Sequence, residues 1–266
     1  MSGSAKFVVA VCILGLVMGL GVLGCKPKTE GQKPEGPTPG AGKEATAVTP
    51  AKTEPVKPPE PAKPAKPGVP EPATVRKCAA APTIDGDLSD ACWKDAEVRG
   101  IWVDIRTAKA VDPQPKVYVC YDDENVYVAF LNPEPKMDKI VAAVTDRDGA
   151  TYTDDSNEVF LDPTAGKKDY LQFIVNTKGV IYDGKGKDGE WNGHAKAAVA
   201  KMDNAWSLEI AIPLSDLGVE GSPKGQTWTA NFCRNRMTEG EAQAIGWADT
   251  GESFHNPSAF GKLKME

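Results

Sequence analysis

The sequence predicts an all-β fold, an antiparallel and jelly-roll-like β-sandwich, over residues 76–266. Many short segments in this range alternate apolar and polar side chains with period two, which is typical of strands that bury one face. Polar or glycine-containing turns separate these segments, and no long helices alternate with them as they would around a parallel sheet. All six tryptophans and all six tyrosines lie in this range, so the hydrophobic core is predicted here.

The individual strands follow from the same alternation. Residues 116–121 (KVYVCY) and 126–131 (VYVAFL) flank a polar turn and predict a β-hairpin. Residues 170–176 (YLQFIVN) and 179–182 (GVIY) predict a second hairpin. The other strands are expected at 98–105, 157–162, 195–201, 205–212, 226–234, 244–247 and 261–265, and short helical segments at 88–96 and 214–217.

The stretch 152–163 (YTDDSNEVFLDP) combines an acidic loop with a strand. Val159 and Leu161 are expected to face the core, because strand side chains point alternately to opposite faces. Glu158, Phe160 and Asp162 are expected to point the other way. A loop held on a rigid strand is a common place for a functional site, although it can also be a solvated turn.

Residues 1–24 are predicted to be a lipoprotein signal peptide. Lys6 precedes an apolar run that ends in small residues, as in export signals, and the run is short for a membrane span. Residues 22–25 (VLGC) resemble a lipobox, in which Cys25 would be lipidated and become the mature N-terminus. We therefore expect an exported protein that is lipid-anchored to the cell envelope, at the outer membrane if the cell has two membranes.

Residues 25–75 are predicted to be a disordered tether that starts at the lipidated cysteine. They are rich in proline, lysine and glutamate and have almost no large apolar residue, so burial cannot offset the entropy of ordering. The proline repeats favour an extended polyproline II conformation. The mixed lysines and glutamates disfavour a polybasic patch, and the formal net charge of −6 gives no support to nucleic-acid binding.

The predicted domain contains four cysteines, Cys78, Cys92, Cys120 and Cys233. Four cysteines allow three disulfide pairings, and the sequence does not choose among them. A Cys78–Cys92 bond would fasten the N-terminal arm of the domain. Cys120 and Cys233 lie within predicted strands and would form a second bond or stay as buried thiols. The spacing of cysteines and histidines does not match a structural zinc site.

Several blocks of the domain resemble the family 9 carbohydrate-binding modules. They are IDGDLSDACWKDA, VYVCYDDENVYVAFLN, DDSNEVFLDP, YLQFIVNTKGVIYD, WSLEIAIPLSDLG, WTANFCRNR and GWADTGESFHNPSAFGKLKM, and they span nearly the whole domain in the family's order. Modules of this family are β-sandwiches found with xylan-degrading enzymes. The resemblance implies non-catalytic binding of a plant-type or envelope polysaccharide, an oligosaccharide or a chain end, with polysaccharide-degrading enzymes as candidate partners.

The same resemblance implies particular site residues. Tyr152 and Phe254 match two aromatics that clamp a terminal sugar, Glu158 matches a hydroxyl acceptor, and Asn176 matches an amide. Aromatic faces next to carboxylates and amides suit a pyranose ring, whose faces are apolar and whose rim is polar. Trp191, in a glycine-rich loop, is a further candidate ligand face. Two positions depart from the sugar binders: Ile174 replaces an arginine, and Gly251 replaces an asparagine.

Each candidate also has a structural interpretation. Tyr152 could be an ordinary loop residue and Phe254 could cover one end of the sandwich. Glu158 could order the acidic loop, and Asn176 could satisfy backbone groups of the adjacent turn.

The family resemblance also implies structural calcium, which prefers six to eight oxygen ligands. Two groups of acids have oxygen-rich spacing; they are Asp85, Asp87 and Asp90 in DGDLSD, and Asp154 with Asp155. Neither group completes an EF-hand loop. Turn and cap aspartates are the alternative interpretation and are the favoured one.

Other functions have less support in the sequence. No GxSxG, HExxH or glycine-rich phosphate loop occurs, so we expect no enzyme and no organic cofactor. Some sandwiches of this superfamily bind haem b, and the residues available for that role are Met137, Met202, Met237, His194 and His255. A structural or interaction lipoprotein of the envelope, without sugar binding, is the third alternative.

Overall fold

The computed structural model describes residues 66–238 and 242–266. The predicted signal peptide, Cys25 and the predicted tether up to residue 65 lie outside the described residues. In the described part, no helix is long and apolar enough to cross a membrane.

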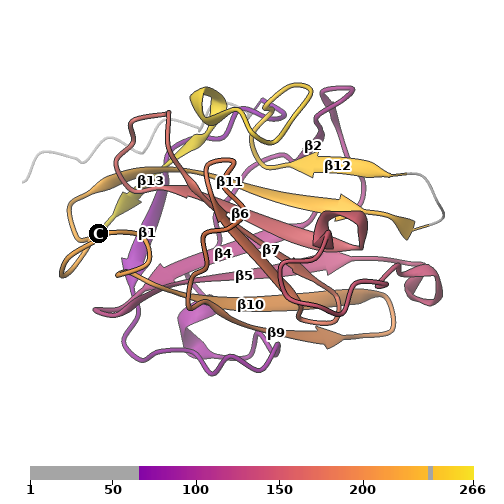
Figure 1. The fold of residues 1–266 in the computed structure, drawn as a ribbon, viewed down its shortest axis with the longest axis horizontal. Helices are drawn as coiled ribbons and strands as arrows, with labels where there is room; N and C mark the ends of the chain where they lie inside the picture. The colour runs from indigo at the N-terminus through magenta and orange to yellow at the C-terminus, as the bar shows by residue number, and fades with distance from the viewer. Residues whose placement is uncertain (1–65, 239–241) are drawn as a thin grey trace, which may run out of the picture. The chain divides into compact units, whose positions relative to one another are not determined.

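The described strands form two layers that face each other across an apolar core (Figure 1). The strands of the first sheet are β2 (Val103–Asp104), β3 (Lys109–Ala110), β6 (Ser156–Asp162), β7 (Leu171–Asn176), β8 (Ile181–Lys185), β11 (Thr227–Arg236), β12 (Gln243–Gly246) and β13 (Gly261–Met265). Those of the second are β4 (Lys116–Tyr121), β5 (Asn125–Pro133), β9 (Lys196–Lys201) and β10 (Ala205–Pro213). In the first sheet, β11 pairs with β6 along one side and with β12 and β13 along the other. The second sheet has the order β4-β5-β10-β9.

Strand β1 (Ala73–Lys77) joins the two sheets. Its first half runs parallel to β13, and its second half runs parallel to β4. The folded part therefore begins earlier than the predicted boundary at residue 76. The backbone of Gly68 is also fixed, because its N–H donates to Ile101 O at 2.9 Å. Composition could not reveal the earlier start of the folded part, since the partners of β1 come from distant parts of the chain.

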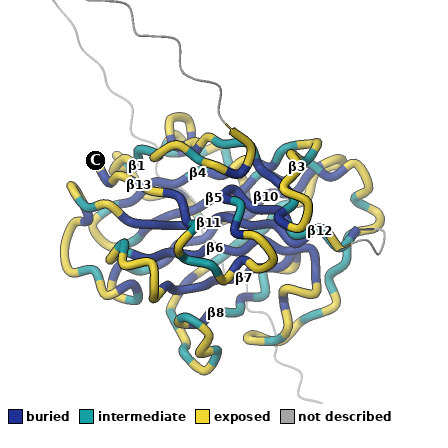
Figure 2. The backbone as a smooth tube through the Cα atoms, turned by 90° about the horizontal axis from the view of Figure 1, so that it is seen from above, coloured by how far each residue is buried: buried dark blue, intermediate teal, exposed yellow. Residues whose placement is uncertain are grey.

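Alternation of side chains builds the core as predicted. In β10, Trp206, Leu208 and Ile210 face inward and are buried. In β6, Val159 and Leu161 belong to the same core, so the predicted orientation of this strand is confirmed. Figure 2 shows the result, with buried strands at the centre and exposed turns around them.

Three predicted elements differ from the structure. Only Val103–Asp104 is a strand within the predicted 98–105. The predicted helix at 88–96 is reduced to the 3-10 turn η1 (Ala91–Trp93), and 214–217 forms turns. These segments follow the surface of neighbouring strands, and contacts with those strands decide their conformation. Val98 N, for example, donates to Val117 O at 2.9 Å.

Each sheet also carries a small apolar cluster on its outer face. On the first sheet, Phe160, Tyr170, Cys233, Phe254 and Phe260 pack together. On the second sheet, the segment around η1 covers β4, β5 and β10, and the buried residues are Trp93, Ala96, Cys120, Tyr127, Ala129 and Ala211.

The four domain cysteines are free thiols in the structure. Cys120 and Cys233 belong to the clusters on opposite outer faces, so the two sheets, about 10 Å apart, separate them. A disulfide needs Cα atoms closer than about 7 Å. Of the two alternatives for this pair, the Cys120–Cys233 bond is therefore wrong and two buried thiols are confirmed, and the Cys78–Cys92 bond considered for the arm is not formed either.

A charged network lies at one end of the sandwich. Glu134 and Arg234 are both buried, and Arg234 Nη2 donates to Glu134 Oε2 at 2.8 Å. Arg236 donates to both oxygens of the same carboxylate, at 2.6 and 2.9 Å. Burial raises the pKa of Glu134, but the hydrogen bonds and charges of the two arginines more than offset this and leave that pKa below its ordinary value.

Candidate functional site

A cleft of about 480 Å³ lies on the outer face of the first sheet. Side chains of β6, β7, β8, β11 and β12 form its floor, and four segments, at residues 105–106, 152, 186–187 and 252–255, form its walls. The residues that line it are Ile105, Arg106, Tyr152, Glu158, Gln172, Ile174, Tyr182, Gly186, Lys187, Asn235, Ala244, Glu252, Ser253, Phe254 and His255.

The polar part of the floor is the Glu158 carboxylate, which points outward from β6 as predicted. Gln172 Nε2 donates to Glu158 Oε2 at 2.7 Å, and Asn235 Nδ2 donates to Oε1 at 2.6 Å. Burial raises the pKa of Glu158, while the two amide hydrogen bonds oppose that shift. Each of its two oxygens accepts one amide hydrogen bond, so Glu158 keeps lone pairs that can accept from a bound hydroxyl-rich molecule.

The two predicted clamp aromatics line this one cleft but differ in exposure. Tyr152 lies on the 3-10 turn η3 (Thr151–Thr153), and 55% of it is exposed. Phe254 is only 8% exposed, because it packs against Phe160 at 6.4 Å between ring centroids. Tyr152 is therefore largely open to solvent at the cleft, whereas Phe254 is largely covered by its neighbours.

The two departures from the family pattern have different surroundings. Ile174 is buried in the floor, between Glu158 on β6 and Tyr182 on β8 in the sheet register. It supplies an apolar patch in place of a guanidinium group. Gly251 has φ of 79°, the left-handed region that favours glycine, and lies beside Glu252 in the loop that forms one wall.

Asn176 and Trp191 do not line the cleft. Asn176 Nδ2 donates to Val144 O and Asp154 Oδ2, and its Oδ1 accepts from two backbone N–H groups of the following turn. These bonds correspond to the structural interpretation of this residue. Trp191 packs edge-on against Phe173, with centroids 6.1 Å apart, at the border of the main core.

The acids considered for calcium fasten backbone segments. The two oxygens of Asp154 accept from Ala143 N and Val144 N at 2.8 and 2.9 Å. Asp155 accepts from Val141 N at 2.9 Å and from Met237 N at 3.2 Å. These two acids thus hold the loop 141–144 against the strands.

The DGDLSD acids also serve turns. Asp85 Oδ1 accepts from Asp87 N at 2.9 Å, and Asp90 Oδ2 accepts from Thr83 N at 2.8 Å. The turn is fixed to β10 because Gly86 N donates to Glu209 Oε2 at 2.8 Å. Within 66–238 and 242–266, no three His, Cys, Asp or Glu side chains are placed to hold a metal ion together.

The histidines considered for haem have separate protein partners. His194 hydrogen-bonds to Asp216, with 2.9 Å between Nδ1 and Oδ1, on an exposed loop. His255 lies at the cleft, where its Nδ1 is 2.7 Å from Tyr170 Oη. Of the methionines, Met202 is exposed on the other sheet.

Several residues of the cleft were not predicted. Gln172 could have been found, because it faces the same side of β7 as Ile174. Asn235 lies on β11 and meets Glu158 only through strand pairing. Arg106 and Lys187 come from irregular segments whose sequence carries no such signal.

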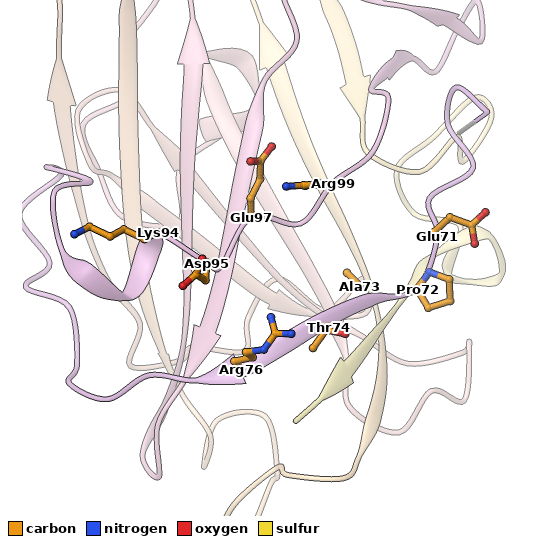
Figure 3. Close-up of a pocket in the computed structure, with 9 residues that line it drawn as sticks. All are labelled: Glu71, Pro72, Ala73, Thr74, Arg76, Lys94, Asp95, Glu97 and Arg99. Atoms are coloured by element: carbon orange, nitrogen blue, oxygen red, sulfur yellow. The ribbon is translucent and has the colours of Figure 1, made fainter. Parts of the chain in front are cut away.

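Two other hollows differ in chemistry from this cleft. One, of about 600 Å³ beside β1, is lined by charged groups such as Arg76, Glu97 and Arg99 and has no aromatic ring (Figure 3). Another, of about 750 Å³ over the second sheet, includes Trp93 and Met202. The Trp93 indole N–H is already bound to Glu209 Oε1 at 2.8 Å.

Comparison with known proteins accounts for the sandwich fold. The model of the family described as "Carbohydrate family 9 binding domain-like" matches residues 84–266. The chain belongs to this family. Endo-1,4-beta-xylanase A of Thermotoga neapolitana is 25% identical over 193 residues, which are 69% of this chain but only 17% of the xylanase.

Solved structures of the family share the fold. A family 9 carbohydrate-binding module from Caldicellulosiruptor kristjanssonii in complex with cellotriose has a TM-score of 0.56 and 20% identity; the match covers 74% of this chain and 94% of that one. The same organism's module in complex with glucose has a TM-score of 0.54 and 20% identity, with coverage of 73% and 95%. The family match and these neighbours confirm the predicted β-sandwich.

The packing of Phe254 leads to a prediction for this wall of the cleft. Phe254→Leu should lower the free energy of unfolding by about 1.5 kcal/mol or less, because an apolar side chain still covers Phe160. Phe254→Ala should lower the free energy of unfolding more than Phe254→Leu does, since it leaves a cavity beside Phe160. Denaturant unfolding of both variants checks this order; equal stability of Phe254→Ala and the wild type would contradict the packing.

His255 should make stability depend on pH. Burial lowers the pKa of His255, so in the window between that lowered value and about 6.5 the unfolded chain binds more protons. The free energy of unfolding should therefore rise with pH across this window. The part contributed by neutral His255 should be lost as the pH falls through the same window. His255→Gln should flatten this part of a denaturation series; an unchanged slope would contradict the assignment.

Proposed function

We propose that the protein binds carbohydrate, without catalysis, in the cleft between Tyr152 and Phe254. The observation that carries the proposal is the combination of an exposed ring at Tyr152 with the hydrogen-bonded Glu158 carboxylate in one cleft. Such a pair suits a sugar, whose C–H face can pack on the ring while its hydroxyls donate to the carboxylate. Membership in a family of carbohydrate-binding domains supports the same function.

The ligand class follows from the departures in the cleft. With Ile174 in the floor, the site offers an apolar surface where the family's sugar binders have an arginine. Arg106 and Lys187 supply cations from the walls instead. We propose an oligosaccharide or chain end of a plant-type or envelope polysaccharide, bound mainly through Tyr152 and Glu158.

The cellular setting is part of the proposal. A lipid anchor at Cys25 and a tether would hold the sandwich at the cell envelope, where polysaccharides and the enzymes that degrade them would be within reach. Metabolic labelling with a fatty acid tests the anchor: label should enter the wild type and be lost in Cys25→Ser. Equal labelling of the two would reject it.

The binding function is tested by calorimetric titration with cello- and xylo-oligosaccharides. Saturable heat with at least one of them is expected, without release of new reducing ends during incubation. Absence of saturable heat across both series, extended to a glycan array, would reject the proposal. Release of reducing ends would reject its non-catalytic part.

A further inference from the structure

Three cysteine thiols meet on the outer face of the second sheet, on the side of the sandwich opposite the cleft. Cys120 points outward from β4, Cys78 directly follows β1, and Cys92 lies in η1. All three line a pocket of about 320 Å³ and pack in the same apolar cluster. Residues from three separate elements are thus brought to one place.

Cys120 is the centre of this group. It lines the same pocket as Cys78 and Cys92, and its thiol partly opposes the upward pKa shift that burial gives both of them. Cys120 is buried, whereas the other two are partly exposed at the pocket. The Cys78 thiol also donates to Tyr121 O at 3.1 Å, which holds it over the strand that carries Cys120.

We propose that Cys78, Cys92 and Cys120 form a thiol–disulfide exchange site, in which Cys120 pairs with either of the other two and a low-molecular-weight disulfide is the oxidant. An odd number of thiols leaves one free after each bond forms. That remaining thiol stays next to the bond and can attack it. Cys233 takes no part, because it lies beyond the core on the other outer face.

Oxidation would proceed by two exchanges. The Cys92 thiolate attacks one sulfur of the oxidant, a mixed disulfide forms, and one thiolate leaves. Cys120 then attacks the Cys92 sulfur, the Cys92–Cys120 bond forms, and the second thiolate leaves. The two protons lost by the cysteines pass to the two released thiols, and the oxidant gains two electrons.

The bond could then move without further oxidation. The Cys78 thiolate attacks the Cys120 sulfur, a Cys78–Cys120 bond forms, and Cys92 leaves and takes up the proton that Cys78 lost. The first bond ties η1 to β4, and the second ties the end of β1 to β4. Burial raises the pKa of Cys92 to about 11, so few thiolates exist near neutral pH and the exchange should be slow.

Peptide mapping of the full chain tests the pairing. The reduced protein is incubated with oxidised glutathione, alkylated with iodoacetamide and digested with trypsin. Cys78 and Cys92 fall in one tryptic peptide, 78–94, whereas Cys120 falls in 117–136 and Cys233 in 225–234. The proposal expects peptide 78–94 joined to 117–136, with Cys233 alkylated.

A second digestion resolves the shared partner. Cleavage before aspartate separates Cys78 (78–84) from Cys92 (90–94), and both should be found joined to the Cys120 fragment (117–121). Cys78→Ser should leave only the Cys92–Cys120 bond, and Cys92→Ser only the Cys78–Cys120 bond. Cys233→Ala is the matched control and should leave the pattern unchanged.

Three outcomes would overturn the proposal. A bond confined to peptide 78–94 would make Cys78 and Cys92 partners and Cys120 a bystander. An alkylated Cys120 in either serine variant, with the variant folded by circular dichroism, would show that Cys120 is not shared. A bond to Cys233 would contradict the separation of the two outer faces.

Discussion

Tyr152→Ala should weaken carbohydrate binding by about 10- to 100-fold, which corresponds to roughly 1.4–3 kcal/mol. The substitution removes a ring of the cleft that is 55% exposed and on which a sugar can pack. Because that ring is more than half exposed, the free energy of unfolding should change by only about 0.5 kcal/mol. Calorimetric titration and denaturant unfolding of the same preparation separate the two effects.

Matched variants sharpen this test. Tyr152→Phe keeps the ring and should keep most of the affinity, whereas Tyr152→Leu keeps apolar volume and should lose much of it. Phe254→Leu should have a smaller effect on affinity than Tyr152→Ala, because Phe254 is largely covered by its own cluster. Wild-type affinity in Tyr152→Ala would mean that the sugar does not stack on this ring.

Glu134→Gln should lower the free energy of unfolding by about 3–5 kcal/mol. Glu134 is buried between Arg234 and Arg236, and the substitution leaves the buried Arg234 guanidinium without the carboxylate that forms its ion pair. An arginine side chain does not lose its proton to relieve that cost. Chemical denaturation with a common slope for both proteins measures the difference.

The control for this prediction is an ion pair at the surface. Lys77 Nζ lies 2.6 Å from Asp123 Oδ2, and the Asp123 side chain is 67% exposed. Asp123→Asn should cost about 1 kcal/mol or less, because water and salt screen an exposed pair. If Glu134→Gln and Asp123→Asn lower the free energy of unfolding equally, burial does not set the contribution of Glu134 to stability.

The sandwich could be predicted because its strands carry their own periodic signal. In β6 and β10 the inward and outward residues are set by alternation alone, and the structure follows it. Strand β1 could not be predicted, since it begins in a proline-rich stretch and its partners, β13 and β4, are far away in the sequence. The predicted strand at 98–105 failed for a related reason, because only two of its residues find a sheet partner.

The candidate site was predictable where a family motif and an outward strand position coincide. Glu158 meets both conditions, and Tyr152 lies in the turn η3, a few residues before the same strand. The near burial of Phe254 could not be read from the sequence, because it depends on Phe160 and Phe260 packing beside it. Asn176 has the right residue type and strand, yet its hydrogen bonds are directed into the neighbouring loop.

The most direct measurement is a crystal structure of the protein with the oligosaccharide that gives saturable heat. We expect a sugar ring packed on the face of Tyr152, with at least one hydroxyl within hydrogen-bonding distance of the Glu158 carboxylate. A sugar bound elsewhere, for example in the hollow beside Trp93 and Met202, with the Tyr152 cleft empty, would contradict the account.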